Sequence, residues 1–503
     1  MKFISLKSIS VALVTSAVMF SACTDLTDGY STDPVNITDP SVVTTDKFLS
    51  GTQVSLIGVY EGDMNRLTGM WTGHFSGEDR QYIGLSNYGV SGRDFNTEWA
   101  GIYSSVGKNA QIVKSRAQAQ HNPRMLAMAQ IAEAMAVGLA ADLWGDVPFS
   151  EMGQYPVIAQ PKFDDQVSVY SNVQVLLDSA IGNMKVGKVP TSVKKAAAAA
   201  DIFFSGDTTM GNWIAVANTL KARYYLHVKD YTNAAKYAGM GIMDPSGNMM
   251  AQHGASYLQN FNLFYSFTNY DRPGYMGGNG YAPMLLDSTT EVHRTNAKTK
   301  EDARLNFYYL PGAGYYVGGA YEENFLTAAD GWIDDPAYNG FFAAEESFPM
   351  VTYEENILIL AEALIKSNDF AGSLAALNSY RDYLNDGGYW SPGYNTDDYA
   401  HLYLEYDAAD FAPGGMENAD GIAPNDALLR EIIEERYITL TGQLEVYNDI
   451  RRTNNLLGIP VKPGNTTIPL RLLYPQSELN TNQNVPSTGV GLFEATDVNK
   501  TPY

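Results

Sequence analysis

The spacing of apolar residues along this chain predicts a protein built mainly from α-helices. Apolar side chains recur at intervals of three and four, which places them on one face of a helix. An apolar stretch at 124–144, dense in Ala and Met, predicts a further helix that ends near Gly145. The clearest periodic runs are Tyr170, Val173, Leu177, Ala180 and Met184, and then Trp213, Val216, Leu220 and Tyr224.

Two segments predict a helix, a short turn and a second helix within about 34 residues, which is the size of one tetratricopeptide unit. One segment joins 212–229 to 231–238, and the other joins 353–364 to 370–384 through a turn at 368–369. A single pair cannot bury its own apolar face, so several pairs are expected to stack into a curved scaffold. The alternative is a generic helical protein in which this spacing is accidental.

The helical pattern is interrupted twice. Between 257 and 345, 19 of 89 residues are aromatic, against 12% for the whole chain, and glycine clusters break regular elements. The stretch 386–424 is a second irregular insertion with several Gly and Pro residues. We expect the aromatic side chains to lie on loops and short strands, and loops on a rigid scaffold commonly carry binding sites.

The first 22 residues are typical of an export signal. Lys2 and Lys7 precede an apolar run at 9–20, which is too short to cross a bilayer core that needs roughly 20 residues. Ser21 and Ala22 come directly before Cys23, as in lipoprotein signal peptides, so Cys23 is predicted to carry the lipid. An ordinary signal-peptidase cut that leaves a free thiol is the alternative.

Cys23 is the only cysteine of the 503 residues, so it has no disulfide partner within the chain. Residues 23–46 lack helical spacing and are predicted to be a lipid-anchored spacer, with the folded body at 47–503. The formal charge of −23 makes nucleic acid an unfavourable partner and leaves the lipid, not a basic patch, as the predicted membrane anchor.

The sequence offers few signs of catalysis. The six histidines lack the spacing that would place two zinc ligands on one helix face, and no serine lies in a Gly-x-Ser-x-Gly elbow. We therefore expect no enzyme activity, no cofactor and no metal site. Acidic pairs leave a glycosidase as a weaker alternative, since that chemistry needs two carboxyl groups close in space. These pairs are Glu322-Glu323, Asp334-Asp335 and Glu345-Glu346.

Exposed aromatic rings offer a large rigid contact area with a polar handle, which suits the flat apolar faces of sugars and of peptide side chains. Three tryptophans lie on or beside helical apolar faces and are predicted to belong to the core: Trp99, Trp144 and Trp213. The predicted ligand-binding residues are Trp71, Tyr82, Tyr88, Tyr270, Tyr275, Tyr281, Trp332 and Trp390.

The order and spacing of several short segments resemble the SusD/RagB family of nutrient-binding outer-membrane lipoproteins of Bacteroidetes, particularly its SusD-like subgroup. Each segment is weak alone, but together they extend over nearly the whole chain. They are 24–34, 71–82 (WTGHFSGEDRQY), 99–103, 141–150 (ADLWGDVPFS), 161–170 (PKFDDQVSVY), 213–227, 352–363 (TYEENILILAEA), 447–453 (YNDIRRT) and 468–474 (IPLRLLY) with Glu478.

This resemblance implies a mainly α fold, in which four tetratricopeptide-like helix pairs support an irregular, loop-rich ligand-binding half. It also implies a lipid-anchored position on the outer face of the outer membrane and a SusC-like TonB-dependent transporter as partner. The expected ligand is an oligosaccharide, or an oligopeptide in some branches, and the expected role is capture without catalysis. A scaffold that binds other proteins is a further alternative. Arg451 and Arg452 are expected to pair with carboxylates.

Overall fold

The computed structural model describes residues 42–154, 156–256, 259–317, 320–326, 336–486 and 490–503. Cys23 and most of the predicted spacer therefore lie outside the described residues, as does Trp332. The first long helix, α2, spans Thr45–Glu61 and so begins two residues before the predicted start of the body. Buried apolar side chains from Leu49 to Val498 form one continuous cluster.

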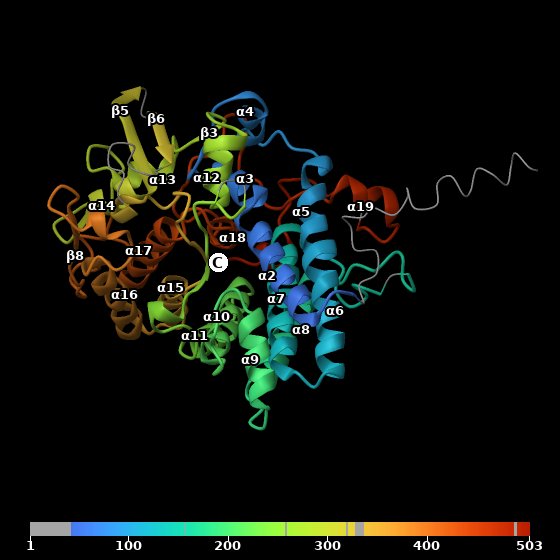
Figure 1. The fold of residues 1–503 in the computed structure, drawn as a ribbon. Helices are drawn as coiled ribbons and strands as arrows, with labels where there is room; N and C mark the ends of the chain where they lie inside the picture. Colours follow the sequence, from blue (N-terminus) through green and yellow to red (C-terminus); the bar gives the residue numbers. More distant parts are fainter. Residues whose placement is uncertain (1–41, 155, 257–258, 318–319, 327–335, 487–489) are drawn as a thin grey trace, which may run out of the picture.

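Four helix pairs among the described residues form the scaffold of the fold, as the resemblance implies, and successive pairs pack against each other. Helices α6 to α8 lie on one side of the molecule and α15 to α17 on the other, with α10 and α11 between them (Figure 1). The pairs are α7 (Pro123–Trp144) with α8 (Gln166–Met184), α10 (Gly211–His227) with α11 (Tyr231–Ala238), α15 (Tyr353–Lys366) with α16 (Phe370–Asn385), and α17 (Pro424–Thr439) with α18 (Glu445–Arg452).

Helix α7 is the first helix of the first pair. It is long and apolar enough to cross a membrane by length and composition, but its apolar stretch is wholly buried within the protein. Asn122 begins the helix by accepting a hydrogen bond from the backbone of Met125 at 3.1 Å. Gly145 ends it with a φ of +85°, a backbone conformation that favours glycine. This helix is therefore part of the core.

The three tryptophans predicted to lie in the core are all buried: Trp99, Trp144 and Trp213. The indole of Trp144 donates to the carbonyl of Leu473 at 2.9 Å, and Trp213 donates to Asp201 at 2.6 Å. The segment after Trp144 closes through a β-bridge between Val147 and Asp164. The indole of Trp99 donates to the half-buried carboxylate of Glu478 at 3.2 Å, so each of the three indoles has a hydrogen-bond partner.

The prediction for the two arginines near the end of α18 is half correct. Arg452 pairs with Glu362 and with Asp449, as expected. Arg451 instead donates to backbone carbonyls, among them those of Asp142 at 2.8 Å and Leu470 at 3.2 Å. Both arginines lie within α18, and neighbouring residues of a helix point in different directions. Arg452 points toward Glu362 on α15, whereas Arg451 points toward the end of α7.

The remaining elements are short strands and shorter helices. Within the described residues, the strands form four antiparallel two-stranded sheets: β1 (Ser76–Gly77) with β3 (Met276–Gly277), β2 (Met249–Ala251) with β7 (Phe348–Val351), β4 (Thr299–Glu301) with β8 (His401–Tyr403), and β5 (Tyr309–Val317) with β6 (Ala320–Leu326). The shorter helices are α3 (Asp63–Trp71), α4 (Arg80–Ser86), α5 (Asn96–Ala100), α6 (Lys108–Ala119), α9 (Thr191–Ala200), α12 (Leu263–Ser266), α13 (Tyr281–Leu286), α14 (Asp302–Tyr308), α19 (Gln476–Thr481) and α20 (Asp497–Lys500).

Many of the described aromatic residues of 257–345 lie in the core. Phe264, Phe307, Tyr308 and Phe342 are buried and pack ring against ring, for example Phe264 against Phe342 at 5.0 Å between centroids. A region with short elements has few aliphatic helix faces, so its own rings supply the core. Among the rings of this stretch whose side chains the structure describes, the partly exposed ones are a minority.

Candidate functional site

A short antiparallel pairing brings two distant segments together at one end of the molecule. Strand β1 pairs with β3, and the backbone N–H of Glu78 donates to the carbonyl of Tyr275 at 2.8 Å. A Cβ on Gly77 would collide with the carbonyl oxygen of Tyr82, so glycine allows α4 to fold back over β1. As a result α4, β3 and α12 lie together, at the top of the view in Figure 1.

Two of the predicted tyrosines meet across this pairing. Tyr82, on α4, lies 5.9 Å from Tyr275 and 5.1 Å from Phe267 between ring centroids. Phe267 is buried, whereas Tyr82 and Tyr275 are each partly exposed. Burial raises the pKa of the Tyr82 hydroxyl, so it stays protonated and able to donate a hydrogen bond at neutral pH.

A second group of rings lies on α12 and the π-helical turn that follows it, Phe267–Asp271. Tyr265 lies 5.9 Å from Tyr270, and Phe261 stacks on Tyr270 at 5.6 Å. Tyr270 is 44% exposed, the most exposed ring among the candidates that the structure describes. We call Tyr82, Tyr265, Tyr270 and Tyr275 the tyrosine cluster.

Two arginines lie beside Tyr275, one ring of the tyrosine cluster. The guanidinium carbons of Arg80 and Arg272 lie 5.5 and 5.9 Å from the ring centroid of Tyr275. The side chain of Arg80 is 72% exposed, and its backbone has a φ of +47°, held by a hydrogen bond from its N–H to Asp79 at 2.8 Å. Strained residues of this kind are concentrated at functional sites. The cluster thus combines apolar ring faces with exposed donors and acceptors.

The structure separates the eight sequence candidates into groups. Tyr82, Tyr270 and Tyr275 belong to the tyrosine cluster, and Tyr281 is half-buried at the start of α13, 6.4 Å from Tyr437. Trp332 lies outside the described residues.

The remaining three candidates, Trp71, Tyr88 and Trp390, are core residues with exposed fractions of 1%, 6% and 5%. The indole of Trp71 donates to Leu85 at 2.9 Å and that of Trp390 to Asn395 at 2.6 Å. A surface ligand does not reach rings buried to this degree, so these three are not part of the candidate binding surface.

Sequence reasoning missed Tyr265, Arg80 and Arg272. Tyr265 shares the aromatic-rich stretch with the chosen tyrosines, so composition alone offers no reason to prefer one over another. The two arginines carry no motif, and their position beside Tyr275 depends on the pairing of β1 with β3. The positive φ of Arg80 leaves no trace in the sequence.

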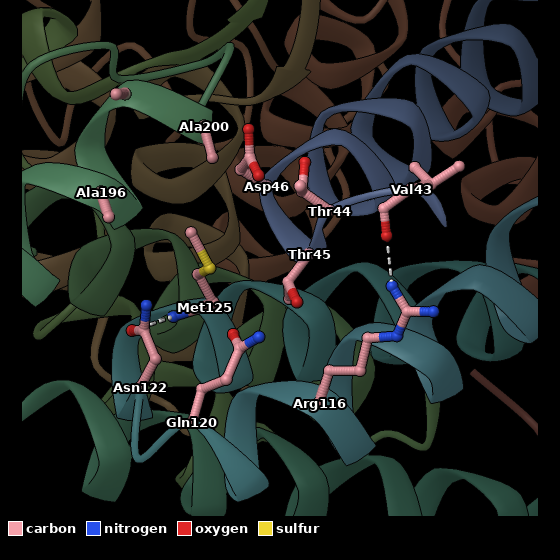
Figure 2. A pocket seen from close by; sticks show the side chains of 11 residues that line it. Val43, Thr44, Thr45, Asp46, Arg116, Gln120, Asn122, Met125, Ala196 and Ala200 are labelled. Carbon is pink, nitrogen blue, oxygen red and sulfur yellow. Dashed lines mark hydrogen bonds between the residues drawn. The ribbon is translucent and has the colours of Figure 1, made fainter. Parts of the chain in front are cut away.

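A groove of about 720 Å³ lies where the described chain begins (Figure 2). It is formed by the start of α2, the ends of α6 and α9 and the start of α7, and Arg116 donates to the carbonyl of Val43 at 2.5 Å. None of the described residues that line it is aromatic, so these residues offer no stacking surface for a sugar ring. The tyrosine cluster is therefore the better candidate for ligand capture.

One buried group has the residue types of a metal site: Asp142, His227 and Glu445. His227 contacts Asp142 at 2.7 Å through Nδ1 and Glu445 at 2.9 Å through Nε2. Burial alone would lower the pKa of His227, but the two carboxylates outweigh it and raise the pKa to about 9. At neutral pH the imidazole is therefore a cation with both nitrogens donating, and it acts as the central charge of an ion-pair network.

Residues 37–475 match the SusD-like family, which is described as starch-binding and associating with the outer membrane. The match includes most of the chain, and the protein belongs to this family. The resemblance noted in the sequence is thereby confirmed. No curated protein sequence matches the chain.

Solved structures of SusD relatives share the fold. A SusD/RagB family protein from Bacteroides thetaiotaomicron has a TM-score of 0.65 at 22% identity, over 92% of this chain and 100% of the other. A chitin-binding SusD homologue from Flavobacterium johnsoniae has a TM-score of 0.65 at 16% identity, over 90% of this chain and 99% of the other. A SusD homologue from Bacteroides fragilis has a TM-score of 0.65 at 16% identity, over 91% and 100%. The predicted mainly α, SusD-like fold is thus confirmed.

Proposed function

We propose that this protein captures oligosaccharides at the cell surface through the tyrosine cluster and delivers them to a SusC-like TonB-dependent transporter. The observation that carries the proposal is the pair of partly exposed rings, Tyr82 and Tyr275, beside the guanidinium of Arg80. Ring faces pack on the apolar faces of a sugar, while the arginine and nearby carboxylates bond its hydroxyls. Membership of a family described as starch-binding supports a glycan ligand.

The proposed role is binding without catalysis. Of the acidic pairs, Glu345 is exposed and Glu346 half-buried, the side chains of Glu322 and Glu323 are not described, and Asp334 and Asp335 lie outside the described residues. Purified protein is expected to leave labelled oligosaccharides uncleaved. Any turnover would favour the glycosidase alternative.

Replacing Tyr82 or Tyr275 by Ala is expected to weaken oligosaccharide binding by about 1–2 kcal/mol, roughly 5- to 30-fold. Each change removes a ring face that is already held in place by its neighbours. The measurement is calorimetry of each variant against a panel of oligosaccharides and oligopeptides.

Tyr225→Ala is the matched control, because Tyr225 is a partly buried tyrosine stacked on Tyr237 at 5.4 Å in the helix scaffold. It is expected to bind like the unaltered protein. If calorimetry detects binding of peptides but not of oligosaccharides, the ligand is an oligopeptide. Unchanged glycan binding in both cluster variants would place the site elsewhere.

The lipid anchor is a separate part of the proposal. Cys23→Ala is expected to abolish retention of the protein at the cell surface, because the strongly negative net charge of the chain disfavours contact with an anionic membrane surface. Cell fractionation measures the retention, and calorimetry on purified protein is expected to show unchanged ligand affinity. A loss of affinity would mean that Cys23 belongs to the folded body.

A further inference from the structure

The last residue of α2 is a glutamate that connects the helix scaffold to the segment bearing the tyrosine cluster. The side chain of Glu61 has no solvent exposure. Its Oε1 accepts a hydrogen bond from the backbone N–H of Leu263 at 2.6 Å, and its Oε2 contacts Nε2 of His253 at 2.9 Å. Leu263 is the first residue of α12, so a scaffold helix is bonded directly to the helical segment 263–271.

This segment is too short to hold its position by itself. It consists of the four residues of α12 and the π-helical turn that follows, and an isolated helix below roughly 12 residues is marginally stable in water. The segment carries Tyr265 and Tyr270, and it also carries Phe267, on which Tyr82 packs at 5.1 Å between centroids. Tertiary contacts of 263–271 therefore decide where three rings of the tyrosine cluster lie.

Two further side chains contact the same segment from other directions. Asn262 accepts hydrogen bonds from the two backbone N–H groups that follow Leu263, and its amide donates to the carbonyl of Glu346 at 3.2 Å, in the loop before β7. The guanidinium carbon of Arg66, on α3 beside α12, lies 4.6 Å from the ring centroid of Phe267 (Figure 1). Glu61 supplies the bond between the first N–H of α12 and the long scaffold helix α2.

A carboxylate suits this position for two physical reasons. An acidic side chain at the start of a helix faces N–H groups that lack a partner within the helix, and a hydrogen bond to a charged acceptor is stronger than one between neutral groups. A donor in the interior that loses its acceptor costs the full free energy of its desolvation. Removing both acceptor oxygens of Glu61 is therefore expected to release 263–271 from α2.

We propose that Glu61 is a positioning residue for the tyrosine cluster: it holds α12 and the turn after it where their rings face a ligand, without touching the ligand itself. Rings that are in place before binding cost the ligand little ordering free energy, so affinity falls when that arrangement is populated only part of the time. The effect on affinity rests on the proposed glycan function, whereas the position of α12 is measurable in the free protein.

Two substitutions of similar size separate the hydrogen bonds of Glu61 from its bulk. Glu61→Met keeps the length of the side chain and removes both acceptors. Glu61→Gln keeps both contacts, because its amide oxygen accepts from Leu263 and its amide nitrogen donates to Nε2 of a neutral His253. The Nδ1 of that ring then donates to the carbonyl of Asn260, which lies 3.2 Å away. The glutamine variant is therefore expected to behave like the unaltered protein.

Hydrogen exchange followed by mass spectrometry tests the position of α12 in the free protein. In Glu61→Met the amides of 263–271 are expected to exchange at least roughly tenfold faster, while those of α16 in the scaffold keep their rates. Glu133→Met is the matched control: Glu133, on α7, is 2% exposed and accepts from Gln111 on α6 at 2.7 Å. It removes a buried carboxylate far from α12 and is expected to leave 263–271 unchanged.

Calorimetry with maltoheptaose and a chitin hexamer tests the consequence for binding. Glu61→Met is expected to bind whichever glycan the unaltered protein binds at least roughly fivefold more weakly. Glu61→Gln and Glu133→Met are expected to stay within about twofold of the unaltered protein, since both keep the hydrogen bond to Leu263. A loss in Glu61→Met that the glutamine restores is not the result of a merely space-filling role.

Unchanged exchange of 263–271 in Glu61→Met would overturn the proposal, as would an equal acceleration in α16, which would mean that Glu61 stabilises the whole fold. Equal effects of Glu61→Gln and Glu61→Met would overturn it as well. Faster exchange with unchanged glycan affinity would show that α12 does not position the binding surface. If the unaltered protein binds neither glycan, the proposed function fails, whereas the exchange rates still decide whether Glu61 positions α12.

Discussion

Replacing Arg223 by Met is expected to lower the free energy of unfolding by about 3–5 kcal/mol. Arg223 lies on α10 with 1% exposure, and its guanidinium donates to both carboxylate oxygens of Glu355 on α15, at 2.6 Å each. It also lies 3.6 Å from Glu445 on α18. Burial alone would lower the pKa of Arg223, but the two carboxylates outweigh it, so the charge is retained. The methionine would leave Glu355 buried without its cation.

Denaturant unfolding of two further variants tests this explanation. The double change Arg223→Met with Glu355→Leu is expected to regain most of the lost stability, because Glu445 still pairs with His227 at 2.9 Å and no carboxylate is left alone. Arg430→Met is the control, since its ion pair with Asp420 is largely exposed and is expected to contribute within about 1 kcal/mol. A double variant less stable than the single one would show that packing around Arg223, and not its charge, dominates.

His227→Gln is expected to destabilise the protein in a way that depends on pH. The folded-state pKa of about 9 lies above the ordinary value for histidine, so the charged ring stabilises the native state. That contribution, about 3 kcal/mol, is fully present below the unfolded pKa of about 6.5. It is lost as the pH rises through about 9, where the folded imidazolium deprotonates.

Urea unfolding of the unaltered protein and the variant, at about pH 6 and about pH 10, measures this dependence. The difference between the two proteins is expected to be largest at the lower pH and to shrink at the higher one. Taking the difference removes the effects of other groups that titrate in both proteins. A difference that stays constant across this range would mean that His227 is neutral in the folded state.

The helix scaffold was predictable because its information is local. The spacing of Trp213, Val216 and Leu220 defines the buried face of α10 without reference to any other element. In the same way, Asn368 and Asp369 mark the turn of the third pair, where Asn368 has a φ of +63° and the side chain of Asp369 caps α16.

The candidate site was only partly predictable because its information is not local. Composition identified a region rich in rings but not which rings face the solvent. Tyr275 and Tyr82 are exposed together because β1 pairs with β3, although about 200 residues separate the strands. Tryptophan is a residue type that often forms stacking surfaces for ligands, but the elements that pack around Trp71 and Trp390 bury both side chains.

The sequence by itself determined the periodic helices and an acidic composition, and it predicted an export signal. Only the tertiary structure decided where those charges lie. Glu362 and Glu435 are fully buried because Arg452 and Arg304, far away in the chain, supply compensating charge, whereas Glu346 and Glu354 have no such partner among the described residues. A helical face depends on residues three and four apart, but the balance of a buried charge depends on every element that packs around it.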